Sequence, residues 1–434
     1  MSPGGTTITT IQDYRQQAAS LLLYQSVFTS APGKSLLTLL ETLTNQSPLD
    51  CALAYGQWFT ALATQQQSWQ QHLIRQILSA DNAFAQQSQT LPEPSTPVSE
   101  HIPPDILAAA RHDFDILHSF YKLSSEQISQ WVKEVCDRPA PPTITAPSTA
   151  PTSHWPSAEE AATYYRTHGV GRFGQFTAFR WQPATDRHQG QLIGIATPDP
   201  IALSQLAAYD HPKQQLIQNT QALLRGYTAQ NVLLYGSRGA GKSSLVKALL
   251  NEYHTQGLRL IEVPKANLHT LPQLIPLLSG IPQKFIIFVD DLSFEEDDEA
   301  FKALKVVLEG SVTARPKNVV VYATSNRRHL IREFFDERPR PKDADEIQAW
   351  DTVQEKLSFS DRFGLTLTFT PADQATYLTI VRQLATQANL RIEIEHLEWR
   401  ARQWATRHNG RSGRSARQFV DFLIAEQDEQ KQDD

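Results

Sequence analysis

Apolar residues recur at intervals of three and four positions through the first third of the chain. The residues that share this spacing include Ile11, Ala18, Leu21, Leu22, Leu37, Leu40 and Leu43. This period places apolar side chains along one face of a helix. Residues 1–137 are therefore predicted to form an N-terminal all-α region, which the run 91–104 divides into at least two pieces. The region is rich in glutamine and poor in charge, and it contains no catalytic constellation.

Residues 138–157 are rich in proline, threonine, serine and alanine. Such a composition predicts an extended, semi-rigid linker between the helical region and the rest of the chain. A pre-core segment, 158–197, follows with a short helix at 158–167 and then the pattern G-x-G-x-x-G at 169–174. In a dinucleotide-binding loop this pattern follows a strand and opens a helix. Here a helix precedes it and an alternating strand, 176–181, follows, so we interpret it as a turn.

From residue 198 onward, helical patterns alternate with short apolar runs. The predicted strands are 232–235, 259–263, 285–290, 318–323 and 365–369. Several are continuously apolar, which is typical of parallel strands covered on both faces. The alternation predicts a doubly wound α/β core over residues 198–370. Residues 371–434 are helical with polar faces, and we expect them to form a small C-terminal helical lid.

Composition narrows the class of protein. A length of 434 residues predicts two or three domains, and a formal net charge of −6 gives no global attraction to nucleic acid. Cys51 and Cys136 match no metal or redox spacing. No apolar run approaches a membrane span, and the first residues lack the pattern of a secretion signal. We therefore expect a soluble cytoplasmic protein.

The segment from Gly236 to Ser243 fits G-x-x-x-x-G-K-[ST], the phosphate-binding loop. The strand 231–235 precedes it and a helix from Ser244 follows, which is the context that the motif requires. Glycines allow backbone N–H groups to surround phosphates, and the helix N-terminus adds its positive dipole end. We expect Lys242 to reach the β- and γ-phosphates and Ser243 to hold Mg²⁺. The expected nucleotide-binding residues are Gly236, Ser237, Arg238, Gly239, Ala240, Gly241, Lys242, Ser243 and Ser244.

The hydrophobic run 285–291 ends in two carboxylates. We expect Asp290 to hold Mg²⁺, in part through water, and Asp291 to orient or activate the attacking water. Aspartate is one methylene shorter than the glutamate usual in that role. Ser293–Glu296 reads as a helix-capping box, with Glu295 as a lesser alternative base. The alternative interpretation of Asp290 and Asp291 is an acidic turn at the strand end that binds nothing.

A polar residue follows one further strand, a basic residue precedes the last strand, and basic residues open a C-terminal helix. Asn326 ends the strand 318–323 and could orient water or touch the γ-phosphate, unless it only forms a turn. Arg362 could reach the γ-phosphate of a neighbouring subunit, or pair with Asp361 on the surface. Arg414 or Arg417 could contact phosphates from the lid. The neighbouring arginines at 400, 402 and 407 leave a solvated basic face or a nucleic-acid patch as the alternative.

These elements in this order resemble the AAA+ ATPases. In that family's terms the loop at 236–243 is Walker A, Asp290 and Asp291 end Walker B, Asn326 is sensor 1, Arg362 is the arginine finger and Arg414 is sensor 2. Longer motifs resemble a bacterial AAA+ family of unknown function; they lie at 198–200, 219–220, 290–295, 323–330 and 355–364. The resemblance covers about residues 158–424. It implies a five-stranded parallel sheet in the order 5-1-4-3-2, a helical lid, ATP with Mg²⁺, and assembly into a ring or filament.

The sequence leaves three functions open. The leading hypothesis is an Mg²⁺-dependent ATPase that remodels an unknown partner. The second is an ATP-dependent binding switch with little hydrolysis, whose N-terminal helices recruit a protein. The third is a nucleic-acid loader, which the acidic total disfavours. We also interpret residues 334–354 as a surface insertion, and we expect adenine contacts from residues 201–209.

Overall fold

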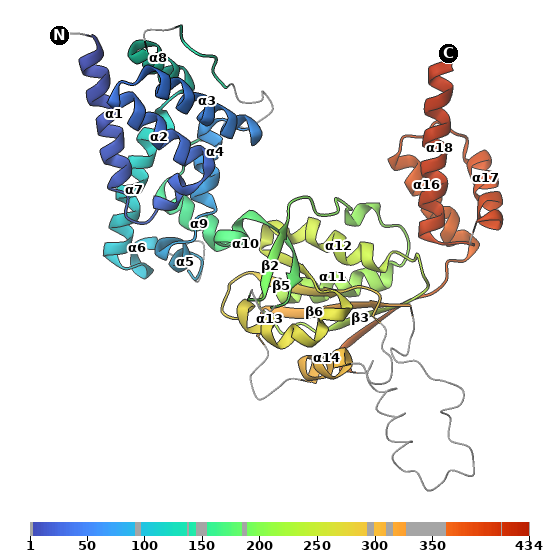
Figure 1. Cartoon of the computed structure of the whole chain (residues 1–434). Coiled ribbons are helices and arrows are strands. Elements are labelled where there is room, and N and C mark those ends of the chain that lie inside the picture. The colour runs from blue at the N-terminus through green and yellow to red at the C-terminus, as the bar shows by residue number, and fades with distance from the viewer. Residues whose placement is uncertain are drawn as a thin grey trace. The chain divides into compact units, whose positions relative to one another are not determined.

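The computed structural model describes residues 3–91, 97–136, 139–144, 154–184, 189–292, 299–309, 316–326, 362–408 and 410–433. The chain divides into two compact units, Met1–Gln175 and Phe176–Asp434. Figure 1 shows both, with the second containing the sheet and the C-terminal helices. Among the described residues, no helix combines the length and the apolar character that crossing a membrane requires.

The regular structure of the first unit is helical wherever its residues are described, as the apolar spacing predicts (Figure 1). Its α-helices are α1 (Pro3–Ala19), α2 (Ala31–Asn45), α3 (Pro48–Thr64), α4 (Trp69–Leu78), α5 (Ala83–Ser88), α6 (Val98–His101), α7 (Pro104–Lys122), α8 (Ser125–Cys136), α9 (Ala158–His168) and α10 (Gly171–Gln175). One apolar core contains buried residues from Ile11 through Val170. Buried polar groups join separate segments of this unit by hydrogen bonds. The Asp113 carboxylate of α7, for example, accepts the backbone N–H groups of Leu22, Leu23 and Tyr24.

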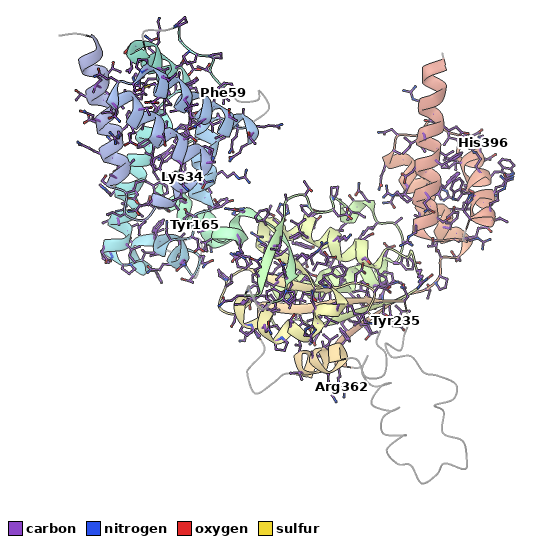
Figure 2. The ribbon with its side chains drawn as sticks, viewed as in Figure 1. Lys34, Phe59, Tyr165, Tyr235, Arg362 and His396 are labelled. Atoms are coloured by element: carbon purple, nitrogen blue, oxygen red, sulfur yellow. The ribbon has the colours of Figure 1, made fainter. Side chains whose placement is uncertain are left out.

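Helix α9 belongs to this core, although it follows the proline-rich segment. Ser157 and Glu160 form a capping box that starts the helix. Tyr165 of α9 is fully buried, and its hydroxyl lies 2.9 Å from the Tyr24 hydroxyl and donates to the Ile77 carbonyl at 2.6 Å. Figure 2 labels Tyr165 within this unit. The division of the chain thus falls after Gln175 and not within residues 138–157, because the apolar face of α9 is buried against the helices before that segment.

His72 is buried in the first unit between two polar partners. Its Nδ1 lies 3.0 Å from the Gln67 amide nitrogen, which donates to it, and its Nε2 lies 2.9 Å from the Ser30 hydroxyl. The Nδ1 atom therefore accepts and the Nε2–H donates. Burial, with a smaller contribution from the charge of Arg75, lowers the pKa of His72 from 6.5 to about 4.

The depressed pKa of His72 predicts a loss of stability in mild acid. As the pH falls below 6.5, His72 becomes protonated in the unfolded chain, whereas in the folded chain it stays neutral until about pH 4. The free energy of unfolding should therefore fall by about 2 kcal/mol from pH 7 to pH 5 through this group alone. Urea unfolding of the whole chain, compared with a His72→Gln variant, measures the difference. An equal pH dependence in both proteins would contradict the prediction.

The second unit contains a sheet of seven strands in the order β2-β1-β4-β5-β6-β3-β7 within the described residues. The strands are β1 (Ala178–Gln182), β2 (Gln191–Ile195), β3 (Val232–Gly236), β4 (Leu258–Glu262), β5 (Lys284–Val289), β6 (Val319–Ser325) and β7 (Leu365–Phe369). The five strands from β3 to β7 are parallel neighbours in the predicted order 5-1-4-3-2, so the AAA+ core fold is confirmed.

Strands β1 and β2 extend this core, so the expected count of five strands was too low. Strand β1 pairs parallel with β4, and the Arg180 and Glu262 side chains of these two strands form an ion pair at 3.0 Å. Strand β2 pairs antiparallel with β1. The predicted strand 176–181 is therefore confirmed as β1. It belongs to the sheet of the core and not to a separate pre-core segment.

Helices cover both faces of the sheet, with α11 and α12 on one and α13 and α14 on the other (Figure 1). They are α11 (Asp210–Leu224), α12 (Lys242–Tyr253), α13 (Leu271–Leu278) and α14 (Glu299–Glu309). Strands β5 and β6 are almost wholly buried, as their continuous apolar runs predict. Asn219 and Thr220, from one of the family-like motifs, contact the Tyr322 hydroxyl at 3.0 Å and so join α11 to β6.

Three helices form the C-terminal lid with a separate apolar core. They are α16 (Gln374–Gln387), α17 (Ile394–Arg407) and α18 (Gly413–Asp433). Ala207 and Ala208, from the segment before α11, pack against the same core. The Gln383 amide of α16 also donates to the Ser204 carbonyl at 2.6 Å. The lid therefore contacts the segment in which adenine contacts are expected.

Candidate nucleotide-binding site

The loop between β3 and α12 has the backbone that a phosphate-binding loop needs. Gly236, Gly239 and Gly241 all have positive φ angles, of 135°, 72° and 85°. At Gly236 an added Cβ would lie 2.0 Å from the Phe369 carbonyl oxygen, so only glycine fits there. At Gly241 an added Cβ would meet no atom within 4 Å. The loop is thus packed where it leaves β3 and open where it enters α12.

Lys242 begins α12, and its ammonium group lies under the loop. Its Nζ donates to the carbonyls of Gly236 at 2.9 Å and Ser237 at 2.8 Å, and to the Asn326 side-chain oxygen at 3.2 Å. Burial lowers the pKa of Lys242, and the carboxylates of Asp290 and Asp291 partly oppose that shift. A cation with limited access to water attracts an anion more strongly than an exposed one does.

Asp290 meets the first turn of α12 at the carboxyl edge of the sheet. Its Oδ1 accepts hydrogen bonds from the Ser243 hydroxyl at 2.6 Å and the Thr324 hydroxyl at 2.5 Å. Carboxylate and hydroxyl oxygens suit Mg²⁺, which also keeps several waters and takes phosphate oxygens. No three metal-binding side chains cluster within the described ranges. Ser243 and Asp290 together fit an ion whose other ligands would come from a nucleotide and from water.

Asp291 and Asn326 form the next layer of the same edge. The Asn326 amide donates to the Asp291 carboxylate at 2.7 Å, while its oxygen accepts from Lys242. The expected residues Lys242, Ser243, Asp290, Asp291 and Asn326 are therefore brought together. Thr324 joins them as a contact that the sequence reasoning missed, although a hydroxyl residue near the end of a buried strand was a usable signal.

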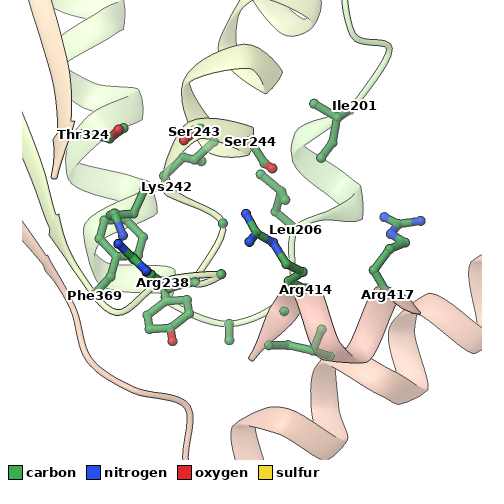
Figure 3. A pocket seen from close by; sticks show the side chains of 18 of the residues that line it. Ile201, Leu206, Arg238, Lys242, Ser243, Ser244, Thr324, Phe369, Arg414 and Arg417 are labelled. Carbon is green, nitrogen blue, oxygen red and sulfur yellow. The ribbon is translucent and has the colours of Figure 1, made fainter. Parts of the chain in front are cut away.

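A cavity of about 740 Å³ opens over these groups. Figure 3 shows part of its lining, with Arg414 and Arg417 entering from the lid. Arg238, Gly239, Ala240, Gly241 and Ser244 also line it. Gly236 and Ser237 do not, and their role here is to accept the hydrogen bonds of Lys242. Both lid arginines reach the cavity, and Arg414 lies against Gly239 of the loop.

The far end of the cavity is mainly apolar. Its lining includes Ile201, Leu206, Ala207, Ala208, Tyr209, Ile380 and Leu384. The Asn251 amide of α12 donates to the carbonyls of Asp199 at 2.8 Å and Ile201 at 2.7 Å, which fixes the start of this wall. Lys213 fixes its middle by donating to the Leu203 carbonyl at 2.6 Å. The segment 201–209 was expected on this side, but its individual residues carried no recognisable motif.

Arg362 is separated from the cavity that its own chain forms. It is half-buried in the turn that leads into β7, with Phe363 and Gly364 between it and the strand, and it does not line the cavity. The phosphate-binding loop lies at the opposite end of β3, which runs parallel to β7. A five-residue strand is about 17 Å long, so Arg362 lies at the other edge of the sheet. Figure 2 shows its position. The capping box at 293–296 and the insertion at 334–354 lie outside the described residues.

Comparisons with known proteins identify a family for this chain. A family model described as "Protein of unknown function (DUF815)" matches residues 174–427. Among solved structures, the RuvB Holliday junction branch migration motor of Thermotoga maritima is 15% identical, with a TM-score of 0.32 over 52% of this chain and 72% of that chain. The FIGL-1 AAA domain in complex with ADP is 19% identical, with a TM-score of 0.34 over 50% and 70%. No curated protein sequence was found to match.

Proposed function

The chain belongs to the DUF815 family of proteins of unknown function, and we propose that it is an Mg²⁺-dependent ATPase of the AAA+ type. One observation carries the proposal. Lys242, Ser243, Asp290, Asp291 and Asn326 lie in one hydrogen-bonded group at the mouth of an open phosphate-binding loop. A glycine-rich turn without a ligand would not need acids and an amide from two neighbouring strands at its mouth.

Each residue has a role that its position supports. Backbone N–H groups of residues 238–244 and the N-terminus of α12 would hold the phosphates. Lys242 would neutralise the β- and γ-phosphate oxygens. Ser243 and Asp290 would hold Mg²⁺, which supplies charge stabilisation during phosphoryl transfer. Asp291, held by Asn326, would orient the attacking water, and Arg414 or Arg417 would contact the phosphates from the lid.

The apolar end of the cavity supports a nucleotide with a base, and not inorganic phosphate alone. A purine ring has flat apolar faces that fit between Ile201, Leu206 and the lid residues Ile380 and Leu384. Since walls of both the core and the lid line this end, bound ATP would join the two. Its hydrolysis would change their relation, and that movement is the work we propose the chain performs on a partner.

The edge position of Arg362 supports assembly into a ring or filament. A guanidinium group at the far edge of the sheet is too distant to contact phosphates in its own chain's cavity, and we propose that it contacts those of a neighbouring copy. The first unit, whose sequence is poor in charged residues, is proposed to recruit a protein partner. The identity of that partner and a cytoplasmic location stay predictions.

Two other functions are less well supported. The binding switch with little hydrolysis is favoured by one observation, the aspartate at position 291 in place of a glutamate. The nucleic-acid loader needs free arginines on the lid. Several of them bind protein groups instead: Arg400 pairs with Glu426 at 2.7 Å, and Arg402 pairs with Glu398 at 2.9 Å. Arg411 donates to the Gln374 side chain at 3.3 Å.

Calorimetry and phosphate release from the purified whole chain test the proposal together. We expect saturable heat on titration with ATP and Mg²⁺, and turnover that EDTA abolishes. No heat and no saturation at millimolar ATP would contradict a nucleotide site. Saturable binding, with a nucleotide-dependent change in mass and no turnover at high protein concentration, would favour the binding switch.

A further inference from the structure

Asp291 has an unusual backbone for a residue at the end of a strand. Its φ angle is +52°, in the left-handed region. Among residues other than glycine, asparagine and aspartate enter this region most readily, because their short polar side chains can form hydrogen bonds with nearby backbone groups. A residue held there at a reactive edge indicates a local constraint. Strand β5 ends at Val289, so the left-handed turn comes two residues after the strand.

Thr324 supplies that constraint. Its hydroxyl accepts the Asp291 backbone N–H at 3.0 Å, and its carbonyl accepts the Leu292 N–H at 2.7 Å. The same hydroxyl donates to the Asp290 carboxylate at 2.5 Å. Thr324 is 2% exposed on the central strand β6, whose neighbours hold it on both sides. One rigid side chain therefore contacts both acidic residues.

The turn decides where the Asp291 carboxylate lies. Residues 286 and 288 of β5 face the core under α11 and α12, and by alternation Asp290 faces the same side toward Ser243. A further extended residue would face the opposite side of the sheet. With the left-handed turn, the Asp291 carboxylate instead lies 2.7 Å from the Asn326 amide, which in turn contacts Lys242. Both acids thus reach one site although they are adjacent in the chain.

We propose that Thr324 is a positioning residue, which holds Asp291 in the left-handed turn and so aims a short carboxylate at the site. On this account an aspartate at 291 suits the turn, whereas a glutamate would favour the left-handed region less and would extend past the contact with Asn326. The inference rests on the proposed ATPase function and deepens it. The left-handed turn would compensate for the methylene group by which Asp291 is shorter than a glutamate.

Two substitutions of Thr324 separate the hydroxyl from the shape of the side chain. Thr324→Val keeps the shape and removes both hydroxyl bonds, whereas Thr324→Ser keeps the hydroxyl. We expect the valine variant to lower kcat by about 10–100-fold, the usual effect of removing a group that orients a catalytic ligand. KM for ATP should change by less than about threefold, since the phosphate-binding loop makes no described contact with Thr324. The serine variant should recover most of the rate.

The Mg²⁺ dependence gives a readout that a merely structural role would not move. In the valine variant the Mg²⁺ concentration for half-maximal rate should rise, because Asp290 loses its second hydrogen bond. Binding of a fluorescent ATP analogue in EDTA should stay at the wild-type affinity. A valine variant with the wild-type kcat and Mg²⁺ dependence would overturn the role of Thr324. Wild-type protein without nucleotide binding or turnover would overturn the proposed function itself.

A second comparison applies even if the valine variant does not fold. Replacing Asp291 by glutamate restores the residue usual in this role but places it in the left-handed turn. We expect kcat of Asp291→Glu to fall below that of the wild type. A rise in kcat would overturn the inference, because it would mean that side-chain length limits the rate and the backbone turn does not.

Discussion

Replacing Arg362 by alanine is expected to lower the rate of ATP hydrolysis by about 10³–10⁵-fold, the contribution of an arginine that neutralises charge in the phosphoryl-transfer transition state. ATP binding should change much less, because Arg362 does not line the cavity of its own chain. Phosphate release under saturating ATP, with binding followed separately by calorimetry, measures the two effects.

Arg225 gives a matched control for that experiment. It is exposed and follows α11 on the approach to β3, as Arg362 precedes the neighbouring strand β7. Arg225→Ala removes the same charge from the same edge of the sheet and should keep the rate within about twofold, as a surface substitution usually does. Comparable losses in both variants would indicate a general effect of charge on assembly and not a specific contact.

Mixing two inactive variants tests whether Arg362 acts on a neighbouring copy. Arg362→Ala keeps its phosphate-binding loop, and Lys242→Ala keeps its arginine. In equal mixture, about a quarter of the sites in a closed assembly would combine an intact loop with an intact arginine from the next subunit. Activity should therefore return to about that fraction of the wild type. A mixture as inactive as its components, in an assembly of unchanged size, would contradict action in trans.

Replacing Lys242 by alanine is expected to remove both tight ATP binding and turnover. Its ammonium is the cation that lies between the loop and Asn326, and the loss of one such preorganised group costs about 10²–10³-fold in rate. Calorimetry with ATP and Mg²⁺ should show weaker binding than in the wild type, and phosphate release should approach the background.

Lys317 provides the corresponding control, since it is exposed just before β6, away from the cavity. Lys317→Ala should leave binding and turnover near the wild-type values. Unfolding curves of both variants check that the fold is retained. If Lys242→Ala hydrolysed ATP at the wild-type rate, the loop at 236–243 would not be the site of the reaction.

Local patterns in the sequence predicted most of the core. The apolar runs that become β5 and β6 end in Asp290 and Asn326, and the motif between β3 and α12 specifies its own strand, turn and helix. These signals span a few residues each. The resemblance then supplied the strand order, which the structure confirms, because order is a non-local property that no single run specifies.

Pairings between distant segments could not be predicted in this way. Strand β1 pairs with β4, some eighty residues later. This pairing depends on which edge of the sheet is open, and no local pattern shows that. The contact of Thr324 with both acids is similar. A hydroxyl residue near the end of the apolar run 319–325 was a usable signal, but its partners were not predictable until the parallel register set Thr324 beside Asp290. The position of the apolar wall at 201–209 depends on hydrogen bonds from Asn251 and Lys213, and local sequence does not reveal these bonds.

The burial of α9 in the first unit decides where the chain can be cut. A catalytic fragment that starts just after the proline-rich segment would retain Ala161, Ala162 and Tyr165 but lose the helices that cover them. Its exposed apolar helix would promote aggregation, and that behaviour would be mistaken for self-association of the second unit. Starting the fragment at Phe176 removes this helix and keeps β1 in the sheet.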